Sequence, residues 1–267
     1  MAELAVVGQD RSELFRFKVG MIPTLAACCI ARISLSRGSD LMNGWAITLR
    51  TISAAMFAAC IVAPAFAIDG KASIDLEEYR IGVPPLDHFD FGVTGGGQPG
   101  QWSVVRDVTA IDGVAIEQSN TDPTENRFPL AIYKPLFLKN FAASIHLKLI
   151  KGTMQTAGIA FRFVNADNYY VVSASALEER IDLLRVLGGK MERIGGTEAD
   201  VTLNHWHKLG VVAEADQFTV SLDDAWLFTV WDRTFLTDGR IGLWTEEDNV
   251  TRFDHFEIRA LPWSEDR

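Results

Sequence analysis

The sequence predicts an all-β protein in which two antiparallel sheets pack face to face. From Trp102 onward, about a dozen short apolar runs of strand length follow one another, and none has the period of an amphipathic helix. Within many runs, apolar and polar residues alternate, which places one apolar face on each strand. Residues that favour tight turns separate neighbouring runs. These observations indicate a sandwich of two sheets that share one apolar core.

Three hairpins can be assigned from their turns. Gly188-Gly189 supplies the positive φ angles of a tight primed turn, and Asp223-Asp224 and residues 165–167 have similar turn chemistry. The strands that these turns are expected to join are 183–187 with 190–194, 218–222 with 225–230, and 158–164 with 169–175.

Composition excludes some classes of function. The 19 Lys/Arg and 31 Asp/Glu residues after position 67 give that part a net charge of −12, which repels phosphate backbones. We therefore expect no nucleic-acid partner. Cys28, Cys29 and Cys60 all precede residue 68, so the expected domain has no thiol nucleophile, thiolate metal ligand or disulfide.

Residues 42–67 have the features of a secretory signal peptide. Arg50 precedes an apolar stretch over 51–66, and Ala65 and Ala67 are the small residues that a signal peptidase needs before its cleavage site. We expect cleavage after Ala67 and a periplasmic or secreted protein with no stable membrane span. Residues 1–41 are then an extension from a start codon assigned too early, with Met42 as the initiator.

Two alternatives to cleavage stay open. An uncleaved signal anchor is one, because residues 51–68 approach the length of a membrane span. Lipidation at Cys60 is the other, although Phe57 and the apolar residues after Cys60 fit a lipidation motif poorly. Beyond the signal, we expect a linker over 68–86, which ends at Pro84-Pro85, the sandwich domain over 87–262 and a tail over 263–267.

Four segments, in order, resemble a known family. Gly158-Ile159-Ala160-Phe161-Arg162 is similar to a strand of the jelly-roll domains named 3-keto-disaccharide hydrolase or family 16 glycoside hydrolase-like, which are related to laminin G-like and concanavalin A-like modules. The other three segments are Trp102-Ser103-Val104 with Asp112-Gly113-Val114, residues 205–209, and residues 239–244 with 253–258. The resemblance covers about 87–261 and implies a concanavalin A-like jelly roll.

The resemblance implies a carbohydrate as ligand, but it rests on core positions. The Glu-x-Asp-x-Glu motif of laminarinase-type glycoside hydrolases is absent from the sequence, which argues against their mechanism. We therefore expect an exported carbohydrate-binding sandwich. A glycoside or 3-keto-glycoside hydrolase, and an envelope protein-interaction domain without a small ligand, are the alternatives.

Five residues are candidates for ligand binding. Arg162 and Tyr170 are expected on adjoining strands and on the solvent-facing side of one sheet. Trp231 has the parity of a surface residue, and Trp244 with Glu246 is expected in a loop that offers a sugar both an aromatic face and carboxylates. Trp226 alternates with apolar neighbours, so we expect it in the core.

Two segments carry residue types that can ligate a metal ion. His205 and His207 are two residues apart on an expected strand, as in metal-binding pairs, but they have no obvious third ligand, so we expect no metal there. The acidic run Glu246-Glu247-Asp248 is a candidate calcium site, with a solvated turn as the alternative.

Overall fold

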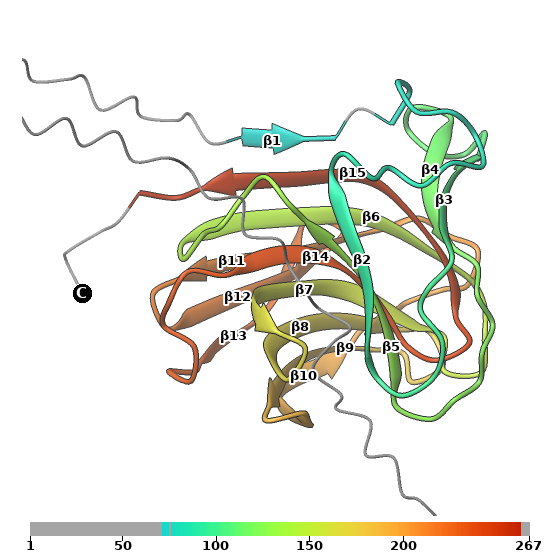
Figure 1. Ribbon diagram of the computed structural model, residues 1–267. Coiled ribbons are helices and arrows are strands. Elements are labelled where there is room, and N and C mark those ends of the chain that lie inside the picture. Colours follow the sequence, from blue (N-terminus) through green and yellow to red (C-terminus); the bar gives the residue numbers. More distant parts are fainter. Residues whose placement is uncertain (1–70, 75, 263–267) are drawn as a thin grey trace, which may run out of the picture. The chain divides into compact units, whose positions relative to one another are not determined.

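The computed structural model describes residues 71–74 and 76–262, and every regular element within these ranges is a strand (Figure 1). The predicted extension (1–41), signal peptide (42–67) and tail (263–267) lie outside the described residues. In the described ranges, no helix has the length and hydropathy of a membrane span. The predicted two-sheet antiparallel sandwich is confirmed.

The strands of the described residues form two antiparallel sheets. Sheet I has the order β13-β12-β11-β6-β15-β4-β3, with β1 paired to β15, and sheet II has the order β10-β9-β8-β7-β14-β5-β2. The strands of sheet I are β1 (Lys71–Ser73), β3 (Trp102–Arg106), β4 (Val114–Gln118), β6 (Phe141–Lys151), β11 (His207–Glu214), β12 (Gln217–Leu222), β13 (Ala225–Trp231) and β15 (Val250–Ala260). Those of sheet II are β2 (Phe89–Gly95), β5 (Arg127–Tyr133), β7 (Thr156–Asn165), β8 (Asn168–Ser175), β9 (Arg180–Leu187), β10 (Lys190–Glu198) and β14 (Arg240–Thr245).

All three predicted hairpins are present. Gly188 and Gly189 join β9 to β10 with φ angles of 57° and 75°, and Asp223 and Asp224 join β12 to β13 with φ angles of 49° and 63°. Aspartate tolerates this left-handed region better than most residues, which explains why the second turn needs no glycine. The β7–β8 hairpin turns just after Asn165, as predicted.

Sheet I follows the predicted alternation. Ile145, Leu147, Leu209 and Val211 point into the core between the sheets and are almost completely buried. The residues that alternate with them on β6 and β11 face outward and are mostly small or polar. The outer face of sheet I can therefore meet solvent or a ligand.

Sheet II departs from the alternation, because its central strands are apolar on both faces. Ile159 and Val172 belong to the core between the sheets, whereas Leu130, Val171 and Trp244 belong to a second buried cluster on the outer face. Strands buried on both faces are apolar throughout. The expectation of one apolar face per strand is therefore wrong for β5 and β8.

Sheet II also curves strongly toward its outer face. The hydroxyls of Thr94 on β2 and Tyr169 on β8 form a 2.7 Å hydrogen bond, although β5, β14 and β7 lie between these strands. Four strand spacings in a flat sheet would separate them by about 19 Å, too far for their side chains to meet. The outer face of sheet II is thus a closed, buried concavity.

Part of the segment expected to be a linker belongs to the sandwich. Residues 71–73 form β1, and Ile74 and Leu76 are buried against the core between the sheets. Further on, Val104 on β3 exchanges backbone hydrogen bonds with residues 82 and 83. Residues 82 and 83 thus extend sheet I at its β3 edge, whereas β1 pairs with β15.

Candidate functional site

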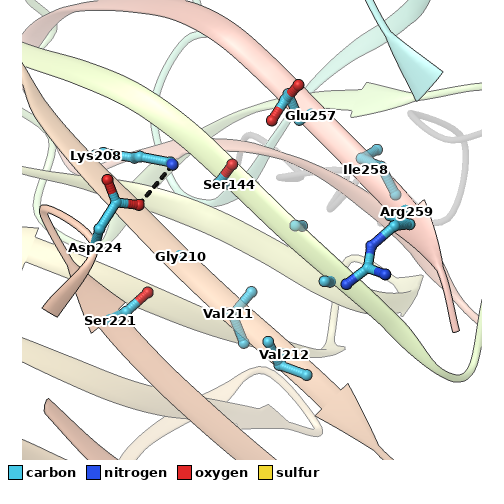
Figure 2. Close-up of a pocket in the computed structure, with 12 residues that line it drawn as sticks. Ser144, Lys208, Gly210, Val211, Val212, Ser221, Asp224, Glu257, Ile258 and Arg259 are labelled. Carbon is cyan, nitrogen blue, oxygen red and sulfur yellow. Dashed lines mark hydrogen bonds and ion pairs between the residues drawn. The ribbon is translucent and has the colours of Figure 1, made fainter. Parts of the chain in front are cut away.

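A groove of about 310 Å³ lies on the outer face of sheet I, across β6, β11, β12 and β15 (Figure 2). Figure 2 shows Lys208 and Asp224 at one side of it and Glu257 and Arg259 at the other. We call this hollow the sheet I groove. Its volume is at the lower end of the range of small-ligand sites.

Three small residues on three neighbouring strands form the floor of the groove. Gly210 on β11 lies opposite Ser221 on β12 and opposite Ser144 on β6 in the strand register. A Cβ atom on Gly210 would lie 2.5 Å from the Ser221 Oγ, so any side chain there would displace the serine. The hollow exists because these side chains are so small.

The floor also offers hydrogen-bonding groups. Within the described residues, neither the Ser144 hydroxyl nor the Ser221 hydroxyl has a hydrogen-bond partner, and both residues are partly exposed. A hydroxyl can both donate and accept. The two serines can therefore hydrogen-bond a ligand that lies across the strands.

The walls of the groove carry charge of both signs. The Lys208 Nζ lies 2.6 Å from an Asp224 carboxylate oxygen. The Glu257 carboxylate lies 3.4 Å from the Nε2 atom of His255. Arg259 is exposed and has no hydrogen bond or ion pair within the described residues. Among the described residues, three of the four charged wall residues thus have a partner, and Arg259 has none.

Trp226 stands next to the groove floor on the edge strand β13. It lies opposite Ser221 in the register and is 67% exposed, with its Nε1 donating to the Thr229 hydroxyl. The prediction that Trp226 is a core residue is wrong. A register shift between the pairs Val220–Phe228 and Ser221–Trp226 breaks the alternation and turns the indole outward.

Two histidines adjoin the groove near Lys208 and Glu257. The rings of His146 on β6 and His255 on β15 are 5.6 Å apart. His255 has a φ of 49° and sits where the β15–β6 register shifts, an uncommon conformation for a residue other than glycine. Burial, and then the neighbouring His255, lower the pKa of His146.

Arg162 and Tyr170 do not share a solvent-facing surface, contrary to the prediction, because both side chains are fully buried. Arg162 has a φ of 45° at a register shift in β7, and this irregularity redirects its side chain. Its guanidinium donates to the carbonyls of Phe235, Lys139 and Ala215. Tyr170 packs in the core between the sheets, where its ring stacks with that of Phe161.

The other three predicted residues lie apart from one another. Trp231 is 65% exposed at the end of β13, in agreement with the prediction of a surface position. Trp244 lies within β14, where it is fully buried and stacked on Phe128. Glu246 follows β14 and is partly buried; burial, and then Glu247, raise its pKa to about 7. The structure therefore does not join the five residues in one site.

The acidic run after β14 is occupied by contacts within the protein. Asp248 accepts hydrogen bonds from the backbone and hydroxyl of Thr153, and Glu247 accepts one from the Asn126 backbone. His207 hydrogen-bonds to Thr202 and Asp223. Among the described residues, no three His, Cys, Asp or Glu side chains are grouped so that they could hold a metal ion.

The residues of the sheet I groove carry no recognisable motif in the sequence. Gly210, Ser144 and Ser221 come from three separate strands, and only the register brings them side by side. The one available signal was the small or polar character of the outward positions on β6, β11 and β12. That signal locates a solvated face but not a hollow in it.

Comparison with solved structures places the fold. The carbohydrate-binding module CBM66 from Bacillus subtilis matches 65% of this chain and 98% of its own, with a TM-score of 0.51 and 19% identity. This chain shares that fold. A protein of unknown function with a galectin-like fold from Bacillus subtilis gives a TM-score of 0.48 at 11% identity, over 66% of this chain and 91% of its own.

A third solved structure is domain 4 of an extracellular GH43 arabinanase from Geobacillus stearothermophilus, in complex with arabinotriose. It matches with a TM-score of 0.47 and 11% identity, over 65% of this chain and 84% of its own. No protein-family model matches the chain. No curated protein matches it either.

Proposed function

We propose that the sheet I groove binds a carbohydrate. The observation that carries this proposal is a hollow with an exposed tryptophan beside it and, in its floor, two serine hydroxyls that have no hydrogen-bond partner among the described residues. Sugars present hydroxyls that need directional hydrogen bonds and apolar ring faces that stack on aromatic side chains. Ser144 and Ser221 answer the first need, and Trp226 answers the second.

The fold supports the same proposal. One solved structure that shares it is named as a carbohydrate-binding module, although at 19% identity it informs the fold and not the ligand. A groove across the outer face of a sheet leaves the core intact whatever it binds. The proposal therefore depends on the groove residues themselves.

The test is a glycan array with the purified protein, followed by calorimetry on any retained glycan. Trp226→Ala should weaken binding about tenfold or more, because stacking on an aromatic ring contributes about 1 kcal/mol beyond area burial. Gly210→Leu should abolish binding by filling the floor. Leu187→Ala, at an exposed apolar position on sheet II, is the control. Retention of no glycan, or equal binding by all variants, would refute the proposal.

A hydrolase of the 3-keto-disaccharide type is the second candidate, favoured by the resemblance of residues 158–162. In the structure, Ile159 and Phe161 are core residues, and Arg162 holds three backbone carbonyls. These residues therefore support the fold rather than the reaction. Product analysis of every glycan retained on the array would detect hydrolysis.

We also propose that the chain is exported and cleaved after Ala67. The support is the sequence of residues 42–67, since the structure does not describe them. Expression of the full chain in a bacterium with two membranes should yield a periplasmic product whose N-terminus is Ile68. Ala65→Leu should block its formation. An intact N-terminus in the cytoplasm would contradict export.

A further inference from the structure

Arg259 stands out among the charged residues of the sheet I groove. In the Lys208–Asp224 ion pair the charges lie 2.6 Å apart and neutralise each other. The Glu257 carboxylate faces His255 at 3.4 Å. Arg259 lines the same groove, is exposed, and has no ion pair or hydrogen bond among the described residues. Among the described residues, its guanidinium is therefore a groove charge without an ion-pair partner.

The position of Arg259 directs its charge at the groove. It lies opposite Ala142 on β6 in the strand register, whereas Glu257 lies opposite the floor residue Ser144, so Arg259 reaches the floor diagonally across the small side chain of Ala142. Figure 2 shows the guanidinium extending from β15 toward β6, while the Glu257 carboxylate lies away from it. A ligand group over β6 would meet the donors of Arg259 first.

Guanidinium chemistry then selects the ligand group. The planar fork of an arginine donates two parallel hydrogen bonds to a carboxylate or a sulfate-like oxyanion, which a lysine cannot do. The chain as a whole carries 35 acidic and 25 basic residues, so its general field does not attract anions. Recognition of an anion here must come from local pairing with Arg259.

The geometry points to an acidic oligosaccharide as the ligand of the groove, an inference that rests on the carbohydrate-binding function proposed above. An anionic substituent of the sugar, such as a uronic acid carboxylate, pairs with Arg259 over β15 and β6. The body of the oligosaccharide crosses Ser144, Gly210 and Ser221, and its far end reaches Trp226. The span from β15 to β13 covers four strand spacings, about 19 Å, which suits several sugar units.

The experiment compares matched acidic and neutral ligands on the same protein. Trimers of galacturonic, glucuronic and mannuronic acid are titrated by calorimetry beside their neutral methyl esters, which keep the same skeleton. A sulfated trisaccharide forms a separate arm that distinguishes sulfate from carboxylate. At least one acid should bind about tenfold or more tightly than its neutral counterpart, and added salt should reduce this preference.

Two variants decide whether Arg259 is responsible. Arg259→Gln should remove the preference for the acid while leaving the affinity for the neutral ester within about twofold. Arg106→Gln is the matched control, since Arg106 is an exposed arginine on β3 that does not line the groove. Melting curves establish that both variants fold.

The outcomes separate the two proposals. Equal binding of acids and esters, or an acid preference that survives in Arg259→Gln, would overturn the inference and leave carbohydrate binding standing. Absence of binding to any sugar, acidic or neutral, would instead refute the proposed function.

Discussion

The hydroxyl of Tyr170, on β8 of sheet II, donates a hydrogen bond to the carboxylate of Asp232, which directly follows β13 of sheet I. The other carboxylate oxygen of Asp232 lies 2.7 Å from an Arg185 nitrogen, on β9. Burial acts to raise the pKa of Asp232, but the hydrogen bonds from Tyr170 and Thr234 outweigh it and lower that pKa. The ionised Asp232 thus links the two sheets through hydrogen bonds.

Loss of the hydrogen bonds to the Asp232 carboxylate should destabilise the fold. Asp232→Asn should lower the free energy of unfolding by about 1–3 kcal/mol, because it weakens a charged hydrogen-bond acceptor that is mostly buried. Tyr170→Phe should lower the free energy of unfolding by about 1 kcal/mol. The double variant should lower it by less than the sum of the two single effects. Urea unfolding measures all three. Trp231→Ala, beside Asp232 but exposed, should change stability by less than about 0.5 kcal/mol; an equal loss there would contradict the assignment.

Arg162 should be structural and intolerant of substitution. Its guanidinium donates to three carbonyls and lies over the Phe218 ring, 4.9 Å from the ring centroid. Arg162→Met should lower the free energy of unfolding by about 3 kcal/mol or more, since buried carbonyls lose their donors. Arg162→Lys should recover only part of this, because an ammonium cannot match the planar fork. Urea unfolding at neutral pH tests both; unchanged midpoints would show that the carbonyls need no donor.

Glu246 should make stability fall as the pH rises. Its pKa is raised to about 7 by burial and then by Glu247, so the folded protein holds a proton that the unfolded chain releases near its ordinary pKa. The stabilising contribution is complete below about pH 4.5 and is lost as the pH rises through about 7. Glu246→Gln should therefore match the wild type in acid and exceed it at pH 8 by on the order of 1–3 kcal/mol. A constant difference across this range would argue against the shift.

Asp107 should act in the opposite direction. Burial opposes its ionisation, but hydrogen bonds from Lys148, Thr109 and Arg252 hold its pKa well below the usual range. The resulting stability is present above the ordinary pKa of about 4 and is lost as the pH falls below it. Asp107→Asn should be about 2 kcal/mol or more less stable than the wild type at pH 7. The difference should shrink in acid-unfolding curves below about pH 4; a gap that persists there would contradict the prediction.

The architecture could be predicted from the sequence because it depends on local signals. The turns at Gly188-Gly189 and Asp223-Asp224 are determined by backbone chemistry within a few residues. Alternation in β6 and β12 likewise reveals the buried face. These signals are sufficient to define two sheets and their hairpins.

The site could not be predicted in the same way, because irregularities of the strands determine it. The alternation of inward and outward residues along the strand predicted Trp226 in the core, but a register shift in β13 turns it outward beside the groove. The same alternation predicted Arg162 on the surface, but its positive φ angle redirects the side chain into a buried position. Such bulges depend on tertiary contacts, such as the carbonyls around Arg162, that lie far away in the sequence.

The double burial of sheet II has a consequence for how its strands find their alignment. A strand with one apolar and one solvent-exposed face is destabilised by a register shift of one residue, because the shift would expose the apolar side chains and bury the polar ones. Tyr169 to Val172 on β8 are all buried, so this penalty is weak there. Close packing restricts the register instead, since a Cβ atom on Gly158 would lie 1.9 Å from the Val172 carbonyl oxygen. The pairing of β7 with β8 is thus set by shape rather than by polarity.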